Sequence, residues 1–335
     1  MRNLYLTILG VCMIGFVFAS TPEKTAKPDE NPTNWTTGHG IGLNISQVGL
    51  KNWSAGGDPS ISFVLNGKYD AKMTKGRHMW DNHIHGEWGM LRIIGEEFRK
   101  NADYVAAETK YGFQIDKVVQ DEEGKDLPGK WYMSVMAGAK SQFSKTYAFD
   151  DDGEKVNTLS KFASPVTVGY SLGIDYVPNP HFSLFMSPLA AKHIIVSNDA
   201  IAAMNLHGNN FKNVNNFFGA ALIATYNQQV YPKPANRISP DDGGDANAIF
   251  LSSRLGLFRD YLNGPAENID VDWQTSVNIK VARYITASVF LHMIWDYDVD
   301  TVSVTDGVQR NMQFIDVIGV GIAYTLAGKK PNLNK

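Results

Sequence analysis

Four ionisable side chains occupy every second position of one short stretch: Asp81, His83, His85 and Glu87. Alternate residues of a β-strand share a face, so the two neighbouring imidazoles could bind one metal ion. The whole row could not hold a single ion, because its ends lie ~20 Å apart at about 3.3 Å per residue. A polar stripe along a strand explains the same spacing without a metal. His83 and His85 are therefore candidate ligands only.

A second acidic row, Asp296, Asp298 and Asp300, stands at the end of a later strand pattern. Carboxylates with this spacing could bind Ca²⁺ in a loop, although a solvated loop explains them more simply. Asp296 and Asp298 are the candidate ligands here. We expect no resident metal and no cofactor.

Residues 169–173 read Gly-Tyr-Ser-Leu-Gly, a pattern that surrounds the nucleophile of many serine hydrolases. That chemistry requires a sharp strand-to-helix turn that exposes the serine, whereas this motif lies inside an unbroken strand pattern. Ser171 is better explained as a small polar residue between glycines. Ser288 and His292 share a strand face, which is the sole support for a serine–histidine lipid hydrolase. We expect no enzymatic activity.

The strands that must position these residues are clearest between Asn268 and Tyr297. Two runs of about a dozen residues alternate apolar and polar side chains and meet at a short turn. Such runs are longer than an average soluble strand and close to the ~9–11 residues of a tilted membrane-spanning strand. Aromatic residues stand toward their ends, where the faces of a bilayer would lie: Trp273, Tyr284, Trp295 and Tyr297.

The same alternation recurs from about Gly40 to Leu326. It predicts an all-β fold, an antiparallel transmembrane β-barrel of about twelve strands (10 to 14). A soluble sandwich or lipocalin, with shorter strands and apolar residues facing inward, is the alternative. Outer-membrane barrels alternate short turns with long outer loops. We expect the polar stretches 95–103, 144–164, 196–215 and 299–313 at the outer end, while 117–129 and 227–247 are long for inner turns.

The chain begins with a pattern typical of a secretory signal peptide: Arg2, an apolar run over 4–18 and Ala19 at a plausible cleavage site. A lipoprotein acylated at Cys12, the only cysteine, is the alternative. We divide the chain into a signal peptide (1–20), a flexible periplasmic lead-in (21–34), a β-barrel domain (35–326) and a polar tail (327–335). A formal net charge of -3 gives no basic excess for binding nucleic acid.

The polar faces of the strands predict a lumen lined by Ser171, Arg254, Gln274, Asn278, Ser288 and His292. Small residues such as Gly173 and Gly319 favour a water-filled path beside part of the wall, and bulky ones such as Phe250 and Phe290 narrow it elsewhere. We therefore predict a narrow passive pore or transport barrel for small solutes, surrounded by outer-membrane lipid. The alternative is a structural or surface-interaction barrel whose outer loops bind a partner. The sequence defines no oligomeric state.

Three segments resemble a known family: Asn52-Trp53-Ser54-Ala55-Gly56-Gly57, then Ser187-Pro188-Leu189 with Lys192, then Leu257-Phe258-Arg259-Asp260-Tyr261-Leu262 followed by Asn268-Ile269-Asp270-Val271-Asp272-Trp273. The resemblance is to an uncharacterised exported family from Bacteroidota, a domain of unknown function, over about residues 35–326. It implies an outer-membrane barrel-like fold and no catalytic residues. Many outer-membrane barrels end on an aromatic residue, whereas a polar tail follows Leu326 here.

Overall fold

The computed structural model describes residues 34–48, 59–117, 130–149, 154–207, 210–231, 248–262, 269–282, 285–296, 301–303, 307–309 and 312–326. The predicted signal peptide (1–20), residues 21–33 of the predicted lead-in and the polar tail (327–335) lie outside the described residues. So do the motif at 52–57 and the candidate ligand Asp298. Among the described residues, no helix has the length and apolar character needed to cross a membrane.

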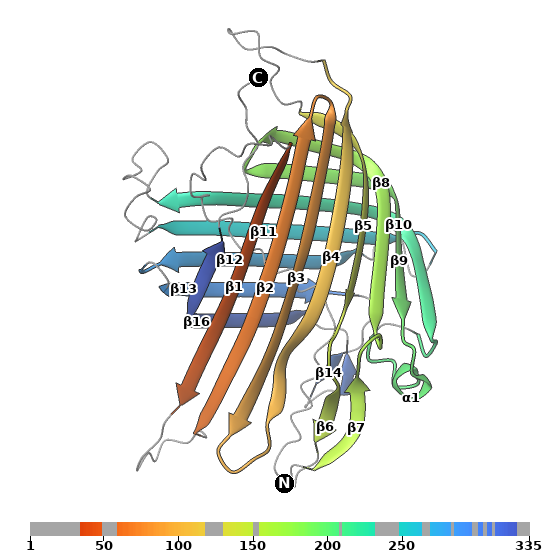
Figure 1. The fold of residues 1–335 in the computed structure, drawn as a ribbon. Helices are drawn as coiled ribbons and strands as arrows, with labels where there is room; N and C mark the ends of the chain where they lie inside the picture. The colour runs from red at the N-terminus through yellow and green to blue at the C-terminus, as the bar shows by residue number, and fades with distance from the viewer. Residues whose placement is uncertain are drawn as a thin grey trace.

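Twelve antiparallel strands close into a barrel (Figure 1). They are β1 (Trp35–Val48), β2 (Ser60–Lys75), β3 (His78–Ile93), β4 (Arg99–Gln114), β5 (Trp131–Ser141), β8 (Val166–Asn179), β9 (Phe182–Ile195), β10 (Val214–Tyr231), β11 (Ile249–Asp260), β12 (Asp270–Lys280), β13 (Ile285–Trp295) and β16 (Gln313–Leu326). Each pairs with the next barrel strand along the chain, and β16 closes the ring against β1. The predicted all-β antiparallel barrel of about twelve strands is confirmed.

Smaller elements gather beyond one end of the barrel, drawn at the bottom of Figure 1. They are the hairpin of β6 (Thr146–Phe149) and β7 (Lys155–Ser160), the helix α1 (Asp199–Ala202), and the pair β14 (Thr301–Ser303) and β15 (Gly307–Gln309). We call the β6–β7 hairpin and α1 the cap. The cap and the β14–β15 pair fall within stretches that the sequence predicted as outer loops. The prediction for 95–103 was too long, because Arg99 already begins β4.

The shortest connections between barrel strands all lie at one end of the barrel. Short turns join β2 to β3, β8 to β9 and β12 to β13 at the end opposite the cap, as predicted. Gly76 lies in the first of these turns with φ +55°, a left-handed conformation that glycine adopts without strain. The long connections 118–129 and 232–247 lie outside the described residues. Because β4 pairs directly with β5, and β10 with β11, no barrel strand is missing at either place.

Side chains on each strand alternate between the barrel interior and its outer face. On β8, Ser171 is buried while its neighbours Tyr170 and Leu172 are exposed. On β12, Gln274 is buried and Trp273 is exposed. The outer face is therefore apolar and the interior mostly polar, which is the reverse of a soluble barrel.

Aromatic side chains form contacts near both ends of the outer face. At the short-turn end, the rings of Trp131 and Tyr176 lie 4.4 Å apart, and a similar pair joins Trp35 to Trp80 at 5.5 Å. Near the cap end, Phe63 contacts Trp88 with ring centroids 5.7 Å apart. Two aromatic girdles with an apolar band between them match the two interfaces of a bilayer.

This outer face predicts a matched pair of substitutions on adjacent residues of β12. Val277→Arg places a charge on the apolar face. It should destabilise the protein folded in lipid by about 2–4 kcal/mol at the midplane. Asn278→Arg places the same charge on the interior face and should cost far less. Urea titration of the protein folded into vesicles measures both values. Equal losses for the two variants would contradict a lipid-facing outer surface.

Candidate functional site

The barrel interior is crossed by an ion pair between distant strands. Nη2 of Arg254 on β11 lies 3.1 Å from Oε2 of Glu108 on β4. In the ring, β5, β8, β9 and β10 separate these strands on one side, and β1, β2, β3, β12, β13 and β16 on the other. The two residues therefore belong to nearly opposite walls, and their side chains meet across the lumen.

Two further ion pairs join strands that are not direct neighbours. Nζ of Lys110 on β4 lies 2.5 Å from Oδ2 of Asp175 on β8, with β5 between them. Nζ of Lys192 on β9 lies 3.3 Å from Oδ2 of Asp270 on β12. Asp175 is completely buried. A buried carboxylate needs a cationic or hydrogen-bonding partner, so this pairing constrains how the walls approach each other.

A buried polar cluster lies on β12 and β13. Nε2 of His292 lies 2.9 Å from Oδ1 of Asp272, and the amide of Gln274 donates to the same oxygen at 2.9 Å. His292 and Gln274 are both fully buried. Nδ1 of His292 has no hydrogen-bond partner among the described residues. The cluster fills part of the interior with polar atoms rather than apolar packing.

The other predicted lining residues also lie on inward faces. Ser288 donates a hydrogen bond to Oδ1 of Asn278 at 2.8 Å, so its hydroxyl is directed to β12. Ser288 and His292 are four residues apart on β13, roughly 13 Å along an extended strand. They form no serine–histidine pair. Ser171 lies within the continuous strand β8, without the strand-to-helix turn that its motif requires in hydrolases.

The structure brings no metal site together among the residues it describes. Nδ1 of His83 lies 2.7 Å from Oδ1 of Asp70 on β2, and the His85 ring contacts Tyr104 edge-on. Asp296 follows β13, far along the ring from these histidines. No group of three or more His, Cys, Asp or Glu side chains in the described part of the chain is arranged to hold a metal ion.

Two inward glycines differ in what surrounds them. A Cβ added at Gly173 would lie 2.1 Å from the carbonyl oxygen of Met186, where the register of β8 and β9 shifts. Gly173 therefore permits a close approach of two strands and opens no water path. A Cβ added at Gly319 on β16 would meet nothing within 4 Å. Of these two predicted small lining residues, Gly319 borders open space.

An apolar cluster occupies the cap end of the barrel, where β9 ends and β10 begins. Ile201 of α1 and Val196 are buried against Phe217 of β10, together with Ile194 and Ala202. Asn198 caps α1 by accepting a hydrogen bond from the backbone N–H of Ile201 at 3.1 Å. Nζ of Lys192 lies 4.5 Å from the centre of the Phe217 ring. The cluster and this cation–π contact hold the cap segment against the barrel wall.

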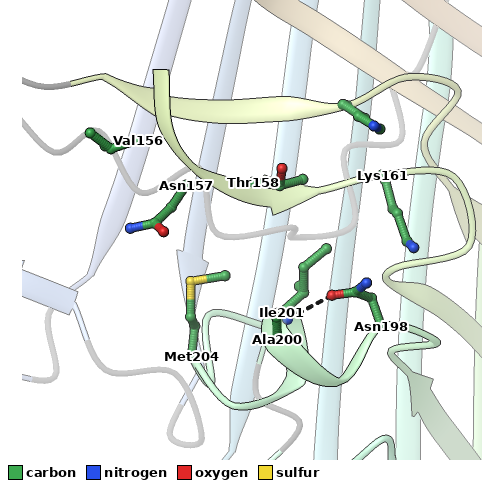
Figure 2. Close-up of a pocket in the computed structure, with 9 residues that line it drawn as sticks. Val156, Asn157, Thr158, Lys161, Asn198, Ala200, Ile201 and Met204 are labelled. Carbon is green, nitrogen blue, oxygen red and sulfur yellow. Dashed lines mark hydrogen bonds between the residues drawn. The ribbon is translucent and has the colours of Figure 1, made fainter. Parts of the chain in front are cut away.

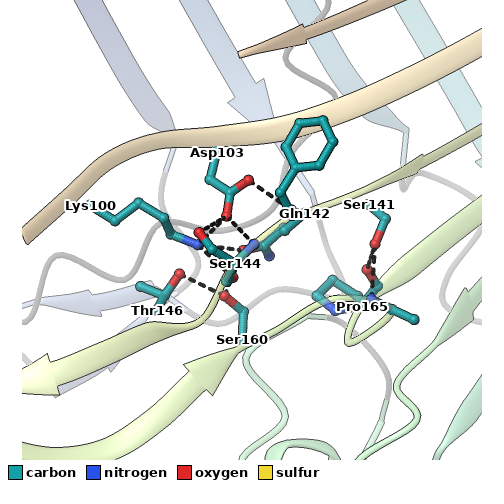
Figure 3. A network of polar contacts seen from close by, with 10 residues as sticks. Lys100, Asp103, Ser141, Gln142, Ser144, Thr146, Ser160 and Pro165 are labelled. Carbon is teal, nitrogen blue, oxygen red and sulfur yellow. Dashed lines mark hydrogen bonds and ion pairs between the residues drawn. The ribbon is translucent and has the colours of Figure 1, made fainter. Parts of the chain in front are cut away.

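A polar network fixes the β6–β7 hairpin to β4 (Figure 3). One carboxylate, that of Asp103, accepts hydrogen bonds from the backbone N–H groups of Phe143 and Ser144 and from the Ser144 hydroxyl, at 2.7–2.8 Å. Nζ of Lys100 lies 2.6 Å from the same carboxylate. Ser160 donates to Gln142 at 2.6 Å within the network. The Asp103 carboxylate thus holds the residues that precede β6 against β4.

The sequence did not identify the partners of these charged groups as site residues. Glu108, Lys110 and Asp272 appear in the pattern only as polar members of alternating strands. Arg254 and Glu108 are 146 positions apart, so no local spacing links them. The sequence indicated only that these residues lie at the inward-facing positions of their strands. The pairing across the lumen depends on strand order and on the stagger of the ring.

Comparison with protein families gives one partial match. A family described as "Protein of unknown function (DUF3078)" matches residues 45–147. This range includes the segment Asn52–Gly57, and it is shorter than the range over which the sequence resembled a domain of unknown function. A Bacteroidota origin stays a prediction. No curated protein matches the chain significantly.

The solved structures that match the chain include several outer-membrane proteins. An outer membrane channel from Pseudomonas putida F1 shares 9% identity over 90% of this chain and 100% of its own, with a TM-score of 0.37. The translocator domain of the autotransporter NalP from Neisseria meningitidis shares 8% identity over 88% of this chain and 90% of its own, with a TM-score of 0.31. OmpF of Salmonella typhi, in complex with daunomycin, shares 10% identity over 87% of this chain and 96% of its own, with a TM-score of 0.28.

The Asp103 network predicts a local effect of one substitution. Asp103→Ala removes the acceptor of two backbone N–H groups and should destabilise the docked hairpin by roughly 1–3 kcal/mol, leaving the barrel closed. Limited proteolysis should cut the β6–β7 region faster in this variant. Asp116→Ala is the control, because Asp116 accepts from the backbone of Lys130 at the opposite end. Unchanged cutting of Asp103→Ala would contradict the assigned role.

The cap should also loosen in acid. Burial lowers the pKa of His207, whose Nε2 lies 3.0 Å from the carbonyl oxygen of Leu159 on β7. When the β6–β7 hairpin undocks, the His207 imidazole is exposed and has its ordinary pKa of about 6.5. On acidification it therefore takes up a proton at a higher pH than the buried imidazole does. The contribution of neutral His207 is therefore complete above about pH 6.5 and is lost as the pH falls below it.

Proteolysis of the cap across this pH range, with a protease active throughout, measures the effect. Cutting should accelerate on acidification in the wild type. His207→Gln keeps an N–H donor without titrating, so its cutting should vary less with pH. An identical acid profile in the two proteins would show that His207 does not control docking.

Proposed function

We propose that this protein is an integral outer-membrane β-barrel that passes small polar solutes through a narrow lumen. The observation that carries the proposal is the Arg254–Glu108 ion pair, which crosses the interior between nearly opposite walls. Both side chains remain partly exposed, at 26% and 32% of their surface. This accessibility within the barrel interior supports a path for water past the pair.

The outer face supports the membrane location. Apolar residues cover it between two aromatic girdles, and the interior holds the charges. In water this arrangement would expose a large continuous apolar surface, which soluble monomeric proteins avoid. The predicted signal peptide is consistent with export to the outer membrane.

The interior supports a narrow path rather than a wide channel. Barrels of about eight strands fill their interiors with side chains, and those of about 16–18 leave an aqueous channel, so twelve strands leave the choice to side-chain size. Here Phe250, Phe290 and His292 are buried within the barrel, and the Arg254–Glu108 pair spans the remaining width. Only small solutes would pass beside such a pair.

A second function, binding of a partner or ligand at the cap, is favoured by one observation. A pocket of about 500 Å³ lies between β7 and α1 (Figure 2). Its lining combines the amines of Lys145 and Lys161 with the polar side chains of Asn157 and Thr158 and the apolar Met204. This composition suits a small anionic group on a surface partner, as the interaction hypothesis requires.

Conductance in planar bilayers tests the pore with two opposite charge changes. Arg254→Ser and Glu108→Ser each break the ion pair, so each should raise the conductance. Arg254→Ser leaves the carboxylate of Glu108 facing the path and should shift the reversal potential toward cation selectivity. Glu108→Ser leaves the guanidinium and should shift it toward anion selectivity.

Leu255→Ala is the matched control, because Leu255 adjoins Arg254 on the alternate, outward parity of β11. Its conductance and selectivity should equal those of the wild type. Absence of conductance in the wild type and in both ion-pair variants would reject the pore and leave partner binding as the function. Selectivity shifts of the same sign in both variants would show that the pair does not line the path.

A further inference from the structure

The first and last strands of the barrel pair along only a short part of their length. Between β1 and β16 the register runs from His39–Leu326 to Asn44–Gly321. On its other side, β1 pairs with β2 along its whole length, from Trp35–Met73 to Val48–Ser60. The closing contact of the ring is therefore its least extensive one among the described strands.

Past the Asn44–Gly321 pair, the facing edges of β1 and β16 have no partner among the described residues. Residues 45–48 of β1 pair with β2 alone, and residues 313–320 of β16 pair with β13 alone. The antiparallel register would set Ile45 opposite Val320, but that pairing is not formed. We call these two edges the seam. It lies toward the cap end, where β1 ends and β16 begins.

One outward side chain at the seam is more exposed than its counterpart in the paired part of the same strand. Ile318 is 77% exposed, whereas Ile322, which lies opposite Leu43 of β1, is 62% exposed. A lipid-facing residue in a continuous sheet is partly covered by neighbours on both sides. The higher exposure of Ile318 agrees with the loss of one neighbouring strand at that position.

The lumen side of the seam changes from crowded to spacious within two residues. At the last formed pair, a Cβ added to Gly321 would lie 1.8 Å from Oδ1 of Asn44, so the Asn44 side chain covers this glycine. At Gly319, the next inward position, an added Cβ would meet nothing within 4 Å. The interior therefore has free space beside Gly319, at the level where β1 no longer pairs with β16.

An unpaired strand edge is costly in hydrocarbon, because its N–H and C=O groups find no water there. A polar group that enters from the lumen side can satisfy them. The seam also carries apolar outward side chains, at Ile45, Ile318 and Val320, that suit an alkyl chain. The two requirements together describe a molecule with one polar head and one apolar chain.

We propose that the seam is a lateral opening through which single-chain amphiphiles pass between the lumen and the bilayer. The head group travels on the lumen side, past Gly319 and the unpaired backbone. The chain stays against the apolar side chains of the outer face. The proposal rests on the proposed function as a transport barrel and adds a second class of solute with its own route.

The test closes the seam with a thiol cross-link. In a chain with Cys12→Ser, the variant Ile45→Cys with Val320→Cys is joined by a bismaleimide. The matched control, Ile41→Cys with Tyr324→Cys, is joined in the same way at a position where β1 and β16 already pair. Proteoliposomes are given a fluorescent lysophospholipid, and dithionite reports how much reaches the inner leaflet. KCl conductance is measured on the same preparations.

The cross-link at 45 and 320 should reduce lysophospholipid transfer to that of protein-free vesicles and leave KCl conductance unchanged. The control cross-link should change neither. Transfer that persists after closure would overturn the lateral opening even if the pore conducts. A loss of transfer on closure in a barrel that conducts no KCl would reject the aqueous pore and keep the opening.

A second variant avoids the cross-link. Gly319→Trp fills the open space at the seam, and Gly67→Trp adds the same side chain on the outer face of β2, where an added Cβ also meets nothing within 4 Å. Both positions have room, so both barrels should fold. Transfer should be lost in Gly319→Trp and retained in Gly67→Trp. Equal transfer in the two variants would contradict the proposal.

Discussion

The pairing of backbone hydrogen-bonding groups is the constraint on which this structure depends. A strand that crosses hydrocarbon has no water to satisfy its N–H and C=O groups, so every strand needs a partner on both sides and the sheet must close. Closure fixes twelve antiparallel neighbours in one ring. It also fixes which side chains point inward, because a shift of one residue in any pairing would reverse both faces. The short β1–β16 contact is the place where this constraint is met least completely.

Once the ring is closed, charge decides the interior. Lys110, Asp175, Arg254 and Glu108 all lie on inward faces, and each finds an oppositely charged partner on a strand that is not its neighbour. Such pairs cost desolvation energy and contribute little net stability. Their consequence is geometric: they define the distance between walls and place charged pairs across the barrel interior. At the cap end, the apolar cluster that includes Ile201 and Phe217 fixes the position of α1 against the barrel wall.

Much of this architecture could be predicted from the sequence because a period of two is a strong local signal. The long alternating runs at β12 and β13 fixed the fold class, the approximate strand count and the inward parity of Gln274 and His292. The partner of Arg254 could not be predicted, because ring order and stagger join it to Glu108. The boundary of β4 was misjudged because Lys100 and Asp103 read as a polar loop, although they anchor the cap from within a strand. Gly173 was taken as lining because a sequence does not show a register shift.

The most direct test of the account measures the two faces of one strand pair in a bilayer. Single cysteines at Val277, Asn278, Ser288 and Val289 carry a nitroxide in a chain with Cys12→Ser, and these positions form two adjacent cross-strand pairs. Oxygen, which concentrates in lipid, should relax the labels at Val277 and Val289 most strongly. A water-soluble nickel chelate should act preferentially on those at Asn278 and Ser288. Strong and equal exposure of all four labels to the nickel chelate would contradict a barrel that crosses the membrane.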